Sequence, residues 1–216
     1  MFAAACAIDL TMLAFDLADK YRTLVFVLGD GAIGQMMEPA EMPPLRPIRT
    51  EAPDYALSGA KDRPRRIVNS LYLGADKLEV LNEQLQAKLQ RIAANELRYE
   101  EQFVNDAELV IVAFGTAARS AQTALQQLRR DGYKVGLLRP ITLWPFPTER
   151  LAELADAGKR FLVAELNAGQ MVHDVREAVG RLVAVDFIGR MGGRLLMPDE
   201  ISDHIIDQLA LTPSIK

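Results

Sequence analysis

From Asp106 onward, short apolar runs alternate with longer amphipathic stretches, and this alternation constrains the fold more than any other feature of the sequence. Short continuous apolar runs are typical of strands buried on both faces of a parallel sheet, whereas apolar residues spaced by three and four are typical of helices. Repeated strand–helix units with short connections require right-handed crossovers, so a parallel-sheet α/β domain is predicted. The predicted strands are 109–114, 135–138, 161–165 and 182–188, and the predicted helices are about 115–130, 148–158, 170–180 and 198–209.

The beginning of the chain looks like part of another unit. Residues 8–21 have a helical apolar stripe, and residues 24–28 form a continuous apolar run that predicts a buried strand. One helix and one strand cannot bury their own apolar faces, so we expect a partner or missing residues to cover them. The segment 39–64 contains six prolines and is predicted to be an extended connection.

A long polar segment follows the connection. Residues 76–103 are predicted to form a helix, because leucines and one isoleucine recur every three or four positions as far as Ile92. A helix packed across a domain seam is favoured over a coiled coil, since Glu96 ends the heptad-like repeat early.

A glycine motif follows the first apolar run and suggests two functions. Residues 29–34 spell GxGxxG, but a dinucleotide site needs a following helix and a second strand, which the nearby prolines prevent. The same Gly29-Asp30-Gly31 also begins the magnesium–diphosphate motif of thiamine-diphosphate enzymes. That motif continues to an asparagine, but the nearest one here, Asn69, lies too far downstream. Neither site is predicted.

Composition excludes several function classes. The net charge is −4 with both signs spread along the chain, so neither nucleic acid nor an anionic membrane is a predicted partner. Cys6 is the only cysteine, which excludes an internal disulfide and a cysteine-ligated iron–sulfur cluster. His173 and His204 show no zinc-ligand spacing, so no metal site is predicted. No apolar run is long enough to span a membrane, and a cytoplasmic location is expected.

Several longer segments resemble one family in its own order. Together they resemble the alpha-type subunit of 2-oxoacid:ferredoxin oxidoreductases, in particular the branched-chain 2-oxoacid (3-methyl-2-oxobutanoate) type. The similar segments are 9–22, 31–39, 67–73, 137–147, 165–172 and 189–193. The most specific of them is 137–147, which includes Trp144-Pro145-Phe146-Pro147.

The resemblance implies a domain organisation. Residues 1–50 would be a remnant of the thiamine-diphosphate pyrimidine-binding domain, and residues 51–104 an extended linker and long helix. Residues 105–216 would form a transketolase carboxy-terminal-like α/β domain. The family pattern extends upstream of Met1, which implies a shortened sequence, a split gene or a misplaced start.

The resemblance also implies the chemistry. The complex would decarboxylate a 2-oxoacid oxidatively to an acyl-CoA and pass electrons to ferredoxin, using thiamine diphosphate, Mg²⁺, 4Fe–4S clusters and coenzyme A. The implied partners are a thiamine-diphosphate-binding beta-type subunit, a cluster-bearing subunit and ferredoxin. This chain alone would hold no cofactor, contain no catalytic residue and be inactive.

Candidate site residues follow from strand polarity, because ligands of parallel sheets bind beyond the carboxyl ends of the strands. After the first run, Asp30, Gln35 and Glu38 are candidates to face thiamine diphosphate or to fill a subunit interface. In the second block the same rule indicates Gly115, Thr116, Arg139 and 165–170, which are expected to brace loops or an interface. Trp144 is expected to be a packed anchor.

Two alternative functions remain open. The chain is also consistent with the beta subunit of a lipoamide-linked 2-oxoacid dehydrogenase, although the segment 144–147 favours the ferredoxin type. A stand-alone α/β binding module built on residues 105–216 is the other alternative.

Overall fold

A computed structural model describes residues 4–44, 47, 50–181 and 183–208. The chain divides into two compact units. One consists of the described parts of Met1–Ala40 and Ile92–Lys216, and the other consists of those of Glu41–Arg91. Every helix in the described ranges is too short or too polar to cross a membrane.

The larger unit is built on a five-stranded sheet in the order β1-β3-β2-β4-β5. The strands β2, β3, β4 and β5 are parallel, which confirms the predicted α/β fold and the four predicted strands with small shifts of their ends. In register, Leu109 lies opposite Val135 on one side and Arg160 on the other. The bounds are β1 Tyr99–Gln102, β2 Leu109–Ala113, β3 Val135–Pro140, β4 Arg160–Glu165 and β5 Val185–Gly189.

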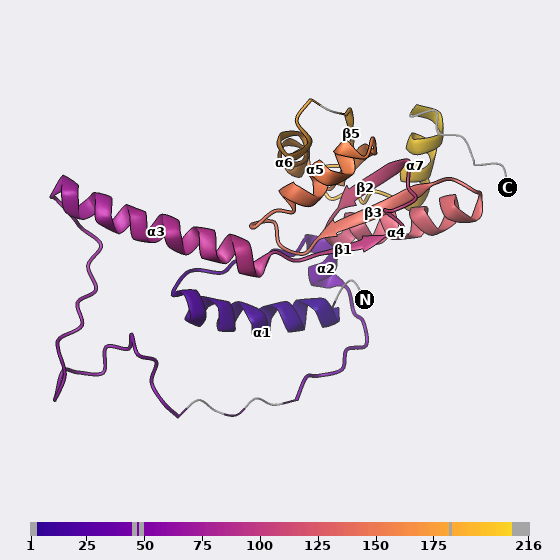
Figure 1. Ribbon diagram of the computed structural model, residues 1–216. Coiled ribbons are helices and arrows are strands. Elements are labelled where there is room, and N and C mark those ends of the chain that lie inside the picture. Colours follow the sequence, from indigo (N-terminus) through magenta and orange to yellow (C-terminus); the bar gives the residue numbers. More distant parts are fainter. Residues whose placement is uncertain (1–3, 45–46, 48–49, 182, 209–216) are drawn as a thin grey trace. The chain divides into compact units, whose positions relative to one another are not determined.

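Helices cover both faces of this sheet (Figure 1). The strand β3 is added on one side of β2 and the next strand, β4, on the other side, so α4 lies on one face with α7, while α5 and α6 pack together on the other. Each face has its own apolar core: alanines of α4 and Leu196 fill the first, and Phe161 and Val175 fill the second. The bounds are α4 Gly115–Arg130, α5 Thr148–Asp156, α6 Met171–Val179 and α7 Pro198–Asp203, which continues as the π-helical turn η1 His204–Gln208.

The predicted helix at 76–103 was too long. The helix α3, Ala75–Glu96, ends earlier, and Tyr99–Gln102 form the edge strand β1, antiparallel to β3. The two glutamates in this segment, Glu100 and Glu101, suit an exposed helix surface as well as an exposed sheet edge. The edge of β3 decides between them, because it supplies backbone partners to β1 and Arg139, which pairs with Glu100.

The beginning of the chain contains the predicted helix but not the predicted strand. The helix α1, Ala4–Tyr21, is present. The apolar run 24–28 is extended, unpaired and exposed, with Leu24 and Phe26 about four-fifths accessible. A strand requires a neighbour to accept its backbone hydrogen bonds, and the described residues provide none beside this run. The glycine motif itself contains only a short helix, α2 Gly31–Gln35, in agreement with the prolines that come after it.

Candidate functional site at the carboxyl edge of the sheet

The neighbouring central strands β2 and β4 lie where the strand order of the sheet reverses. The crossover from β2 leads to β3 on one side, and β4 lies on the other side of β2. Ligands of open α/β sheets bind at such a switch point, near the amino termini of the helices that follow the strands. Here those helices are α4 and α6, and each has a carboxylate of the chain itself at its first turn.

The carboxylate at α4 comes from Asp30, which caps two helices at once. Its Oδ1 accepts hydrogen bonds from the backbone N–H groups of Ala32 (3.1 Å) and Ile33 (3.0 Å), the first turn of α2. Oδ1 also accepts from the Thr116 hydroxyl at 2.8 Å, and Oδ2 accepts from the Thr116 backbone N–H at 2.8 Å. Phe114, the N-cap residue of α4, supplies no side-chain hydrogen bond. Asp30 therefore provides the cap that the local sequence of α4 lacks.

The start of α4 is shaped to admit this carboxylate. Gly115 has a φ of +58°, and a Cβ built on it would lie 2.8 Å from Asp30 Oδ2. A side chain at Gly115 would thus be strained and would displace the carboxylate. The next residue, Thr116, is only 6% exposed, so its N–H and hydroxyl depend on Asp30 for their partners.

The electrostatics at Asp30 favour the ionised form. Burial raises the pKa of its carboxyl, but hydrogen bonds from Ile33, Thr116 and Ala32 more than offset this, and the net pKa lies below its ordinary value. A carboxylate at the amino terminus of α4 also meets the positive end of the helix dipole.

Glu38 also turns toward α4. Its carboxylate forms an ion pair with Arg119, which lies one turn after Thr116 and also donates a hydrogen bond to the Met36 sulfur at 2.9 Å. Gln35 is exposed at the end of α2. Of the three candidates from the sequence, Asp30 and Glu38 thus contact α4 and Gln35 does not share their contacts.

A second carboxylate caps α6. Glu165, at the end of β4, is 1% exposed and accepts backbone hydrogen bonds from Gln170, Met171 (2.9 Å) and Val172 (3.0 Å), besides one from the Asn167 side chain. The predicted loop-bracing role of 165–170 is therefore what the structure shows.

The other candidates of the second block lie at separate places. Arg139, near the end of β3, is 8% exposed and pairs with Glu100 of β1 at 3.0 Å. The prediction for Trp144 was wrong, since this side chain is 57% exposed. The nearby prolines, Pro140, Pro145 and Pro147, indicated a rigid turn, but they do not determine whether the indole of Trp144 is covered.

A cluster around Glu96 was not predicted from the sequence. Glu96, taken only as the end of the helical repeat, is 4% exposed and accepts hydrogen bonds from Lys20 Nζ (2.7 Å), the Tyr21 hydroxyl (2.6 Å) and Arg98 (2.9 Å). The bonds from Lys20 and Tyr21 lower the pKa of the Glu96 carboxyl to about 2. The signal in the sequence was a glutamate in line with an apolar stripe, which requires a charged partner when it is buried.

The described acidic residues do not fit a diphosphate-bound magnesium ion. Asp30 of the GDG sequence already accepts four hydrogen bonds from the chain. Within residues 4–208, apart from the gaps given above, no group of three or more His, Cys, Asp or Glu side chains could hold a metal ion. In this structure both carboxylates at the carboxyl edge, Asp30 and Glu165, accept hydrogen bonds at the starts of helices.

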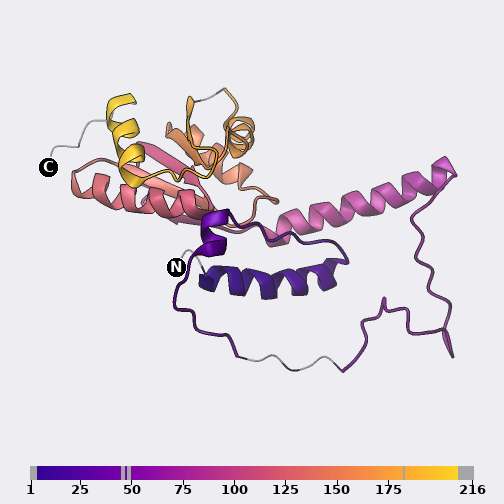
Figure 2. The same cartoon turned by 180° about the vertical axis from the view of Figure 1, so that it is seen from behind.

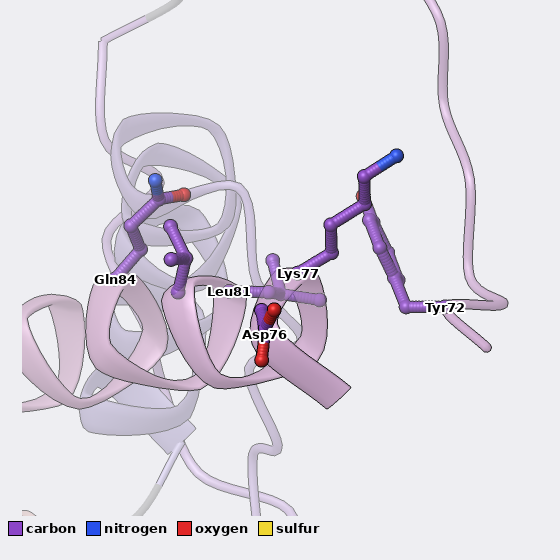
Figure 3. Close-up of a pocket in the computed structure, with 6 residues that line it drawn as sticks. Tyr72, Asp76, Lys77, Leu81 and Gln84 are labelled. Atoms are coloured by element: carbon purple, nitrogen blue, oxygen red, sulfur yellow. The ribbon is translucent and has the colours of Figure 1, made fainter. Parts of the chain in front are cut away.

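The smaller unit contains a surface hollow of about 420 Å³ on the first turns of α3 (Figure 3). Figure 3 shows the Tyr72 ring and the Lys77 side chain on one side of it and Gln84 on the other. Its lining comes from the single segment 72–84 and combines apolar surface with one acidic and one basic side chain, Asp76 and Lys77. Most small-molecule sites bring together polar groups from several helices, strands or loops, whereas this hollow is lined by one segment.

Comparisons with known proteins agree with the fold and extend it. Residues 107–201 match the family described as pyruvate:ferredoxin oxidoreductase core domain II. The ketoisovalerate oxidoreductase subunit VorB of Methanothermobacter thermautotrophicus is 46% identical over 197 residues, which cover 91% of this chain. The VorB subunit of Methanothermobacter marburgensis is also 46% identical, over 188 residues and 87% of this chain. The chain belongs to the family of these VorB subunits. The predicted family resemblance is thereby confirmed.

The match to the VorB family is partial in length. The chain spans 56% and 53% of these two relatives, which is about half of each. A solved 2-oxoglutarate:ferredoxin oxidoreductase from Magnetococcus marinus, with 2-oxoglutarate, coenzyme A and succinyl-CoA bound, superposes on 64% of this chain and 24% of its own, with a TM-score of 0.57 and 21% identity. This likeness shows a shared fold.

Proposed function

We propose that the chain acts as a subunit of a 2-oxoacid:ferredoxin oxidoreductase of the ketoisovalerate type. The observation that carries the proposal is the 46% identity to two VorB subunits over about nine-tenths of the chain. The complex would decarboxylate a branched-chain 2-oxoacid oxidatively, form the acyl-CoA and reduce ferredoxin.

The residues of this chain support a contributing role within a complex. One cysteine cannot ligate an iron–sulfur cluster, which takes about four thiolates. The carboxylates at the carboxyl edge, Asp30 and Glu165, are used to cap helices. Thiamine diphosphate, Mg²⁺, the clusters and coenzyme A are therefore proposed to be held mainly by partner subunits, namely a thiamine-diphosphate-binding subunit and a cluster-bearing subunit.

We propose in addition that residues 1–50 represent part of a pyrimidine-binding domain and that the second block, 105–216, is a transketolase carboxy-terminal-like domain. Within the first, Asp30 and Glu38 hold the segment 30–38 on α4, and Gln35 and the 96% exposed Met37 are presented outward. This segment is the proposed face toward thiamine diphosphate or the partner subunit.

Affinity purification of the tagged chain from its natural host tests this assignment. The proposal expects a cluster-bearing subunit and a thiamine-diphosphate-binding subunit to copurify in stoichiometric amounts. Copurification of a lipoyl-domain protein would instead support the beta subunit of a lipoamide-linked dehydrogenase. A chain recovered alone that binds a nucleotide tightly through residues 105–216 would support a stand-alone module.

A further inference from the structure

The contacts of residues 30–38 with α4 form a latch, defined here as the Asp30–Thr116 hydrogen bonds and the Glu38–Arg119 ion pair. We propose that this latch, with the Glu96 cluster as a second tie, keeps residues 4–40 bound to residues 92–208 independently of the covalent connection through 41–91. The proposal does not depend on the function proposed above.

The two segments belong to one compact unit although a long connection separates them in sequence. Residues 41–91 form their own unit, so the chain leaves the larger unit after Ala40 and returns to it at Ile92. In Figures 1 and 2 the short helix α2 lies beside the beginning of α4 in both views. Two distant parts of the chain therefore meet across a contact that residues 41–91 do not form.

Charged side chains take part in the hydrogen bonds across this contact, and Ile33 adds an apolar side chain close to Gly115. Residues 24–28, between α1 and the latch, are exposed and contribute little burial. The bonds that join the two segments include those of Asp30 to Thr116, Arg119 to Glu38 and Met36, and Lys20 and Tyr21 to Glu96. Charge-assisted hydrogen bonds of this kind are roughly twice as strong as neutral ones.

Asp30 is the central group of the latch. It fixes α2 and α4 to each other through a single carboxylate, and the space beside Gly115 admits that carboxylate closely. Loss of the carboxylate would leave the buried N–H and hydroxyl of Thr116 without a partner. The free-energy cost of these unpaired groups would weaken the contact between the two segments.

The experiment cuts the connection in the full chain. A protease recognition sequence is inserted between Ser58 and Gly59, which are both exposed, and the cleaved chain is analysed by size-exclusion chromatography and by dilution. The cleaved native chain is expected to elute as one species. Asp30→Ala is expected to raise the dissociation constant of the two fragments by about tenfold or more, since a charged hydrogen bond contributes about that factor to an equilibrium.

Matched variants separate the latch from a general loss of charge. Asp9→Ala removes an exposed aspartate of the same fragment and is expected to leave the dissociation constant unchanged. Asp30→Asn, which keeps one oxygen acceptor, should fall between the native chain and Asp30→Ala. Thr116→Val removes only the hydroxyl bond and should weaken association several-fold, about the effect of one hydrogen bond, even if Asp30→Ala fails to fold.

Two results would overturn the proposal. Fragments of the cleaved native chain that separate at once would show that the covalent connection through 41–91 is needed to hold the segments together. Equal dissociation constants for Asp30→Ala and Asp9→Ala, with Thr116→Val unchanged, would show that the latch contributes nothing.

Discussion

Replacing Glu165 with alanine is expected to destabilise the larger unit more than any substitution of an exposed residue on α6, the helix that Glu165 caps. The carboxylate is 1% exposed, and the N–H groups of Met171 and Val172, which donate to it at 2.9 and 3.0 Å, belong to residues that are 3% and 2% exposed. Water cannot replace the carboxylate at such buried amides without local opening.

The magnitude follows from these two amides. Each buried donor left without a partner costs about 1–3 kcal/mol, so Glu165→Ala should lower the free energy of unfolding by about 2–6 kcal/mol. Relief from burying the charge offsets part of this loss. Glu165→Gln keeps one oxygen acceptor but turns an NH₂ group toward N–H donors, so its effect should be smaller but in the same direction.

Urea unfolding followed by circular dichroism measures the effect, with Glu177→Ala as the control because Glu177 is an exposed glutamate of the same helix, α6. The control is expected to change the unfolding free energy by less than about 0.5 kcal/mol. If Glu165→Ala matched the control, the capping role assigned to Glu165 would be refuted.

Two further predictions concern other parts of the larger unit. Gly136→Ala should lower the free energy of unfolding by about 1–3 kcal/mol, because the new Cβ would lie 2.9 Å from the Val104 Cα. Gly74→Ala, where the space is open, should leave this free energy unchanged. Equal urea midpoints for the two variants would contradict the prediction. The pKa of Glu96 falls from 4.5 to about 2 on folding, so its contribution to stability is complete above pH 4.5 and disappears as the pH falls toward 2. Urea midpoints measured across this range should fall less steeply for Glu96→Gln than for the native chain, and parallel curves would argue against the cluster.

Local patterns were sufficient to predict most of the sheet. Continuous apolar runs such as 109–113 and 161–165 are buried along their length, and the turn residues between them fixed the order of strands and helices. Gly132, with a φ of +88°, follows α4 as a C′ glycine, and Pro198 begins α7.

The errors arose where a distant partner decides the structure. Residues 24–28 have the composition of a buried strand, but no described neighbour pairs with them, and residues 99–102 become a strand because the edge of β3 is available. Asp30 was proposed as a candidate because it follows an apolar run, but its two-helix cap depends on Thr116, which is 86 residues away in sequence. A sequence alone does not show which helix lacks its own cap and which carboxylate supplies it.

The most direct test of the proposed function is a reconstituted activity assay. The chain is coexpressed with the products of neighbouring genes, and coenzyme-A-dependent reduction of a viologen dye is measured with pyruvate, 2-oxoglutarate and 3-methyl-2-oxobutanoate in parallel. The proposed function predicts dye reduction that requires this chain and is fastest with 3-methyl-2-oxobutanoate. Full activity of the remaining subunits without this chain would contradict it.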